Sequence, residues 1–282
     1  MTFTWKNPGK RAERERVWFE RWIREGYTVR QLVHQSGHGT WKMQSIIRYW
    51  LDRPPTEPTT LASAQRIIVD GSYLDHRHGI VAIMNGESRC IIAGRFGIKE
   101  GSALFQRFCE SLKQKGLAPE SATIDGNPQL FRCLRMVWPN ITVQRCLVHI
   151  QRQGLSWCRR DPKRADAKHL RELLLRVTSI ETGGDRDTFL SDLQAWEERY
   201  GSRLARRPGK GWVMSDLIRA RSMIRHALPN MFHYLDDPTI AKTTNGLEGY
   251  FSRLKGHYRR HRGLSKEHRD AYFRWHFALH ER

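Results

Sequence analysis

The sequence is short of acidic residues and has no long apolar run. Its 282 residues include 29 Asp and Glu against 49 Lys and Arg, which gives a formal net charge of +20 at pH 7. No uninterrupted apolar segment approaches the roughly 18 residues that a membrane-spanning helix needs. Residues 1–6 contain no apolar stretch that would serve as a secretory signal. We therefore expect no membrane partner and a cytoplasmic location.

Cysteine is also scarce. The chain has five cysteines, an odd number, and no two of them have CxxC spacing. This pattern argues against a disulfide framework and against a four-cysteine zinc site, and it favours reduced thiols in a cytoplasmic protein.

Positive charge and tryptophan are what the chain has in quantity. Hydrophobic residues make up 39% of the sequence and include 10 Trp, which is enough for real cores and argues against a disordered basic tail. The length suggests two domains, or three. A soluble protein this basic usually meets a polyanion, and nucleic acid is the default candidate.

Residues 1–52 read as a small helical DNA-binding domain. Apolar residues recur at helical spacing before Gly26, Thr28 is a suitable N-cap for a second helix, and Thr40 is one for a third. Helix, short glycine-bearing turn, helix is the pattern of a helix-turn-helix. A plain three-helix unit without DNA contacts explains the same pattern. The basic charge favours DNA, with Lys42, Gln44 and Arg48 on the recognition helix.

A linker and a mixed α/β region follow. Residues 53–60 contain three prolines in a polar stretch, which predicts an extended linker and a domain boundary. Residues 61–150 then alternate short β-branched runs with helical patterns, in the order β-β-β-α-β-α-β-α. The predicted strands lie at 67–69, 80–84, 89–98, 122–124 and 141–143, and the predicted helices at 102–115, 128–137 and from 146 onward.

The remaining sequence is helical throughout. Residues 151–239 show no strand pattern and form the predicted helical insertion, with a turn at Gly183 and Gly184. Residues 240–282 predict a long basic helix from about Thr244, broken near Gly263. Its basic side chains are the expected phosphate contacts: Arg253, Lys255, Arg259 and Arg260.

Three carboxylates stand out by their positions. Asp70 and Asp125 each close a β-branched run and precede glycine, and Glu248 lies near the start of the last long helix. Each has an ordinary explanation, because Asp-Gly is a common turn and an acidic residue suits a helix N-terminus. Carboxylates at two strand ends and a helix start can also converge at one sheet edge. Such a site suits Mg²⁺ or Mn²⁺, and two ions would clamp a phosphodiester.

Cys146 and His149 are spaced i, i+3 and share a helix face. A zinc site would need two further ligands, and a cysteine nucleophile lacks any supporting motif. We therefore expect a packed pair close to the sheet edge.

The ordered motifs resemble a known family. Asp70 after a strand, Ile124-Asp125-Gly126-Asn127, Cys146-Leu147-Val148-His149 and Thr244-Asn245-Gly246-Leu247-Glu248 follow one another, and the tail continues with Phe251-Ser252-Arg253-Leu254-Lys255. This set resembles a bacterial insertion-sequence transposase of the DDE class, similar to the Mutator-like superfamily. The resemblance covers roughly residues 67–275.

The resemblance implies a fold and a mechanism. It implies a ribonuclease H-like mixed sheet, with both aspartates on neighbouring strands and an all-helical insertion at 151–239 before the final core segment, 240–282. Asp70, Asp125 and Glu248 would be catalytic and would hold two Mg²⁺ or Mn²⁺ ions, with Cys146 and His149 supporting them. The implied partners are double-stranded DNA at transposon ends and target, in a homodimer or larger assembly associated with the nucleoid.

Other interpretations remain open at this point. Asp75 lies near Asp70, although it does not close a strand. A non-catalytic or domesticated DNA-binding protein would explain the charge but not three ordered carboxylates. A ribonuclease H-like host nuclease would explain the carboxylates, but it needs neither a helical insertion nor a separate N-terminal domain that recognises a DNA sequence. A structural protein that coats a polyanion would not need an ordered α/β core.

Overall fold

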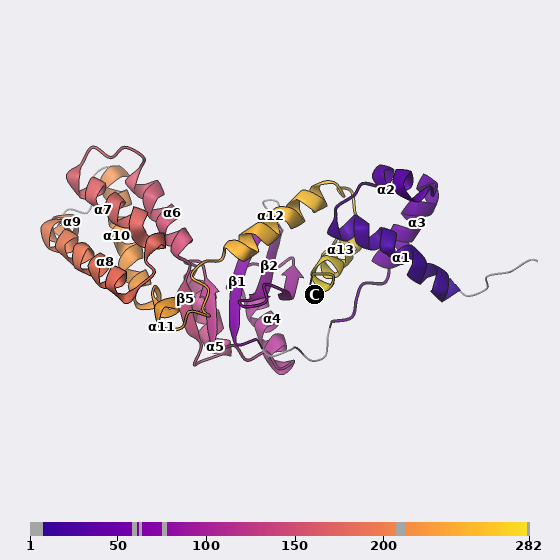
Figure 1. Cartoon of the computed structure of the whole chain (residues 1–282), viewed down its shortest axis with the longest axis horizontal. Coiled ribbons are helices and arrows are strands. Elements are labelled where there is room, and N and C mark those ends of the chain that lie inside the picture. The colour runs from indigo at the N-terminus through magenta and orange to yellow at the C-terminus, as the bar shows by residue number, and fades with distance from the viewer. Residues whose placement is uncertain (1–7, 58–60, 62–63, 75–77, 207–211, 281–282) are drawn as a thin grey trace, which may run out of the picture.

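The fold is built around one five-stranded mixed sheet in the middle of the chain (Figure 1). The structure is a computed structural model, and it describes residues 8–57, 61, 64–74, 78–206 and 212–280. The strands have the spatial order β3-β2-β1-β4-β5. The first three are antiparallel neighbours, whereas β4 is parallel to both β1 and β5. Their bounds are β1 Arg66–Tyr73, β2 Gly79–Asn85, β3 Ile91–Phe96, β4 Ser121–Ile124 and β5 Thr142–Arg145.

Both faces of the sheet are buried, because alternate residues of each strand point to opposite sides. Ile67 and Val69 of β1 join a core with the helices α4 (Ala103–Gln114) and α5 (Pro128–Val137). Ile68 faces the other side and joins a core with α12 (Asn245–Arg259) and α13 (Lys266–Ala278). The predicted order of strands and helices over residues 61–150 is confirmed.

The N-terminal helices share that second core. They are α1 Pro8–Arg24, α2 Val29–Ser36 and α3 Thr40–Leu51. The Trp275 ring of α13 lies 5.2 Å from the Phe19 ring and 5.8 Å from the Trp50 ring, and its Nε1 donates to the Trp50 carbonyl at 2.9 Å. Residues 8–51 therefore pack as part of the main body, and this packing does not support an N-terminal unit decoupled by the proline-rich segment.

The helical insertion has a core of its own and extends from the opposite end of the sheet (Figure 1). No strand occurs among the described residues of 151–239, as predicted. Its elements are α6 Leu147–Cys158, α7 Ala165–Arg176, α8 Gly183–Trp196, α9 Ser202–Arg206, α10 Trp212–Ala227 and α11 His233–Asp236, with short irregular turns at Val177–Ser179, Glu197–Gly201 and Leu228–Asn230.

Several local predictions need correction. Strand β1 does not end at Asp70 but continues to Tyr73, because β2 pairs with it along that whole length. The N-cap of α3 is Gly39 rather than Thr40, whereas Thr28 forms the expected capping box at α2. Gly183 and Gly184 begin helix α8, since Thr182 caps it, instead of forming a turn.

None of the helices within the described ranges is both long enough and apolar enough to cross a lipid bilayer.

Candidate active site

Asp70 is the most buried carboxylate of the candidate site. It lies inside β1, opposite Ala82 of β2, and only 6% of its surface is exposed. The parallel pairing of β1 with β4 covers residues 66–68 of β1, so Asp70 lies just past the point where that pairing ends. Burial raises the pKa of Asp70 to about 8, and the nearby Glu100 and Asp125 carboxylates contribute to the rise.

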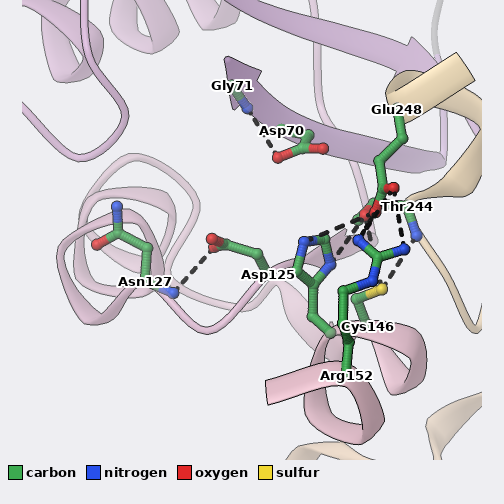
Figure 2. Close-up of polar contacts among 9 residues, drawn as sticks. Asp70, Gly71, Asp125, Asn127, Cys146, Arg152, Thr244 and Glu248 are labelled. Carbon is green, nitrogen blue, oxygen red and sulfur yellow. Dashed lines mark hydrogen bonds and ion pairs between the residues drawn. The ribbon is translucent and has the colours of Figure 1, made fainter. Parts of the chain in front are cut away.

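Asp125 directly follows β4, at the carboxyl end of the neighbouring parallel strand. Its Oδ1 accepts a hydrogen bond from the Asn127 amide at 2.9 Å, and Asn127 in turn caps α5. Asp125 is therefore the turn residue that its sequence suggests. Figure 2 shows its carboxylate directed to the Asn127 amide, and its charge still contributes to the raised pKa of Asp70. The aspartates lie on or next to neighbouring strands, as the sequence resemblance implies.

Glu100 is a fourth carboxylate that the sequence analysis missed. It lies in the loop between β3 and α4, where it hydrogen-bonds the Asp70 side chain and the Gly71 amide. A Cβ atom on Gly71 would lie 2.8 Å from Glu100 Cγ, so only glycine leaves room for this side chain. Burial and the Asp125 charge raise the pKa of Glu100 to about 7. The Gly-Ser that follows it is an ordinary loop motif and offered no signal.

Cys146, His149 and Thr244 form a buried polar cluster between the starts of α6 and α12. The Thr244 amide donates to Cys146 Sγ at 3.3 Å, and Thr244 Oγ1 lies 3.4 Å from His149 Nδ1. Burial alone would raise the pKa of the Cys146 thiol, but hydrogen bonds from His149 and Thr244 outweigh burial and lower it. The same contact with Cys146 raises the pKa of His149 to about 9. The predicted packing of Cys146 beside His149 is thus confirmed.

Glu248 lies on the first turn of α12 and faces α6. One carboxylate oxygen lies 3.6 Å from His149 Nε2, and the other is 3.3 Å from an Arg152 guanidinium nitrogen. The negative charge of Asp70 also contributes to the raised pKa of His149. The imidazole therefore links Glu248 to the buried aspartate. Figure 2 shows the contact between Arg152 and Glu248, with Asp70 on the neighbouring strand.

The carboxylates described above are suitable ligands for a cation, but the structure does not bring them close enough together to form a single binding site. Among the residues that the structure describes, no three His, Cys, Asp or Glu side chains are grouped closely enough to hold a metal ion. Burial, with the charges of neighbouring carboxylates, raises the pKa of Asp70 and of Glu100, and a cation bound near them would favour their ionised forms. Glu248 would have to leave Arg152 to join them.

The predicted DNA contacts on α3 differ in availability. Lys42 is bound to Glu15 of α1 at 2.8 Å and is only partly exposed. Gln44 and Arg48 are exposed. Trp41 is 80% exposed on the same helix, which is unusual for a large aromatic side chain without a partner.

The predicted contacts on and just after α12 differ in the bonds that they make. Arg253, Arg259 and Arg260 are exposed, and Lys255 is half-buried. Lys255 donates to Ser72 Oγ at 2.5 Å, and Arg260 donates to the Gly26 carbonyl at 3.3 Å. Lys255 therefore anchors α12 to β1, and Arg260 connects it to the N-terminal helices. Asp75 lies outside the described residues.

Comparison with known proteins gives one family. Residues 68–207 are matched by the sequence model of the family described as Transposase, Mutator family. The matched segment begins within β1 and ends after α9, part-way through the helical insertion, so it contains Asp70 and Asp125 but not Glu248. The match supports a Mutator-like transposase, and with it a transposase function and a DNA partner. No curated protein matches the chain.

Proposed function

We propose that this chain is a DDE-class transposase of the bacterial insertion-sequence type, built on a ribonuclease H-like core. One observation carries the proposal: Asp70 and Asp125, on or beside neighbouring parallel strands, lie near enough for the Asp125 charge to raise the pKa of Asp70, and His149 interacts with the charges of both Asp70 and Glu248. Glu248 lies on a helix that follows an all-helical insertion. The family match over residues 68–207 supports the same conclusion.

Asp70, Asp125 and Glu248 would hold Mg²⁺ or Mn²⁺, and Glu100 adjoins them as a further oxygen donor. Bound there, divalent ions would activate a water and stabilise charge on the attacking and leaving oxygens of a phosphodiester. Carboxylate oxygens are the ligands that these hard cations prefer. Two ions are expected for this chemistry.

The chain's own residues prepare the site for DNA. His149 contacts Glu248 and interacts with the charge of Asp70, so it would help to hold the Glu248 carboxylate near the sheet edge. Arg152 neutralises Glu248 while no substrate is bound. A DNA phosphate that takes over the Arg152 guanidinium would release Glu248 toward the aspartates. The net charge of +20 draws the polyanion in.

The decisive experiment replaces Asp125 by Asn. Asn serves almost equally well in turns, so the Asn127 contact and the fold should survive. The amide lacks the negative charge that a ligand to Mg²⁺ supplies. We expect Asp125→Asn to bind duplex DNA as the wild type does and to lose Mg²⁺- and Mn²⁺-dependent cutting by at least 100-fold.

A matched control is Asp161→Asn, an exposed aspartate of the helical insertion that forms an ion pair with Lys163. This variant should cut like the wild type. Full cutting by Asp125→Asn would remove Asp125 from the site. Binding without cutting by the wild type would favour a domesticated DNA-binding protein instead.

A further inference from the structure

A cleft opens directly beside Asp125. It lies between the sheet and the helical insertion and has a volume of about 730 Å³. Asp125 and Asn127 line one end, α5 lines one wall, and α6 and α10 line the other. The size is that of a small-molecule site, far too small to admit a duplex.

The cleft carries positive charge close to the carboxylates. Arg145, at the end of β5, packs over Gly126 so tightly that a Cβ atom there would clash with its guanidinium. Its Nε is buried with no hydrogen-bond partner, and among the described residues no carboxylate lies within ion-pair distance of it. Arg132 and Arg219 also line the cleft, and Arg219 has only a loose contact of 3.7 Å with Asp216.

The same cleft presents aromatic surface. Phe131 of α5 and Trp157 of α6 line it, and both are half-buried, so part of each ring remains accessible. Unpaired nucleobases stack on such rings, and a guanidinium binds the phosphate that accompanies them. Apolar and aromatic walls with arginines at the rim therefore match a single nucleotide better than a wholly polar or wholly apolar ligand.

We propose that this cleft binds one unpaired nucleotide of the DNA whose phosphate is presented to Asp125. The base would lie against Trp157, and Arg145 with Arg219 would hold the flanking phosphate. This inference rests on the proposed function, because it takes DNA as the substrate at the adjoining carboxylates. It adds a second point of contact that a fully paired duplex cannot fill without losing a base pair.

The test compares two DNA probes on the full chain, in EDTA so that no cutting occurs. One probe is a fluorescein-labelled blunt duplex, and the other is the same duplex with a single-stranded extension of three thymidines. By anisotropy the wild type should bind the extended probe about tenfold more tightly, a factor in the range expected for one stacked base. Trp157→Ala should abolish that preference and change blunt-duplex affinity less than twofold.

Two control variants separate the cleft from general effects. Trp41→Ala removes an exposed tryptophan of α3 and Arg107→Met removes an exposed arginine of α4, so both should keep the tenfold ratio. Arg219→Met should reduce it. Equal binding of the two probes by the wild type, or a ratio unchanged in Trp157→Ala and Arg219→Met, would overturn the cleft and leave the proposed function standing. Failure to bind either probe would overturn both.

Discussion

Asp70 and Glu100 are two carboxyl groups in one largely buried space, so ionising both of them costs free energy. The pKa of Asp70 is raised to about 8 and that of Glu100 to about 7, in each case first by burial. In the unfolded chain both groups lose their protons near pH 4. The folded protein therefore retains protons that the unfolded chain has released, and its stability falls as pH rises from about 4 to 8.

Asp70→Asn should relieve this destabilisation. At pH 8 the variant should gain unfolding free energy on the order of a few kcal/mol relative to the wild type, and at pH 4 almost nothing, because both carboxyl groups are then neutral. Urea unfolding at the two pH values measures the difference. The exposed Asp161→Asn should show no gain at either pH. An equal gain at pH 4 and pH 8 would show that the effect is not electrostatic.

Divalent cations should act on the same groups. If Mg²⁺ binds at Asp70 and Asp125, it should raise the melting temperature of the wild type at pH 8 and release protons as it binds. Calorimetry in two buffers of different ionisation enthalpy counts those protons. Asp70→Asn should show less than half of the shift in melting temperature. A shift that is the same in wild type and variant would place the cation elsewhere.

At the residue level, the sequence revealed the candidates that lie in regular patterns. Asp125 and Glu248 were found because one follows a β-branched run and the other begins a helix, and both occupy those places. Glu100 and Arg152 were missed because their importance comes from contacts across the fold. Glu100 reaches Asp70 over a loop, and Arg152 meets Glu248 across 96 positions of sequence.

Among the elements, α13 has the widest structural role, because it supports both the sheet and the N-terminal helices. Trp275 contacts Phe19 and Trp50 on one side, and Phe277 fills the space left by Gly94 of β3 on the other. Periodicity predicted each of these helices but not which of them pack together. The prolines of the linker correctly predicted a break in helix, yet a break in secondary structure does not require a break in the core.

Trp275→Ala should therefore destabilise more than its own helix. We expect a loss of about 3–5 kcal/mol, typical for removal of a buried large aromatic side chain. Limited proteolysis should then cut within residues 24–29, between α1 and α2, faster than in the wild type. Trp41→Ala, which removes an exposed ring, should stay within about 0.5 kcal/mol of the wild type. If proteolysis of residues 24–29 is as slow in Trp275→Ala as in the wild type, the N-terminal helices are stable without contact from Trp275.

His261 joins α1 to the end of α12 and should make this interface sensitive to acid. Its Nε2 lies 2.9 Å from the Trp22 carbonyl, and burial lowers its pKa to about 4. Since the unfolded imidazole takes up a proton near pH 6.5, stability should fall as pH drops from 6.5 to 4, by up to about 3 kcal/mol. His261→Gln, which keeps a donor for Trp22, should flatten that slope in urea titrations. If the dependence of stability on pH is unchanged in this variant, the acid sensitivity comes from other buried histidines.

At the scale of the whole molecule, charge dominates the expected behaviour with DNA. The chain carries a net charge of +20, and its exposed arginines include Arg48 on α3 and Arg253 and Arg259 on α12. If about eight phosphates are contacted, the logarithm of the binding constant should fall with the logarithm of salt concentration with a slope near −7. Anisotropy titrations from 50 to 200 mM salt, roughly the range where this effect is large, measure it.

Arg253→Ala combined with Arg259→Ala should make that slope shallower by about 2, with equal loss on unrelated sequences, since phosphate contacts carry no sequence information. Gln44→Ala is the contrasting variant, because an exposed amide on α3 can read a base edge. It should leave the slope unchanged and weaken only preferred sequences, by roughly 1–3 kcal/mol. A slope near zero for the wild type would assign the basic surface to another purpose.

The helical insertion also sets the order in which the site can be completed during synthesis. Asp125 and Glu248 are separated by 248 − 125 = 123 positions, and α12 rests on α13, which ends only at Ala278. At about 5–20 residues per second, a ribosome needs roughly 6–25 s to pass from one carboxylate to the other. The aspartates and the sheet therefore exist first without Glu248. A nascent chain that stops before α12 therefore lacks Glu248, the third carboxylate of the proposed site.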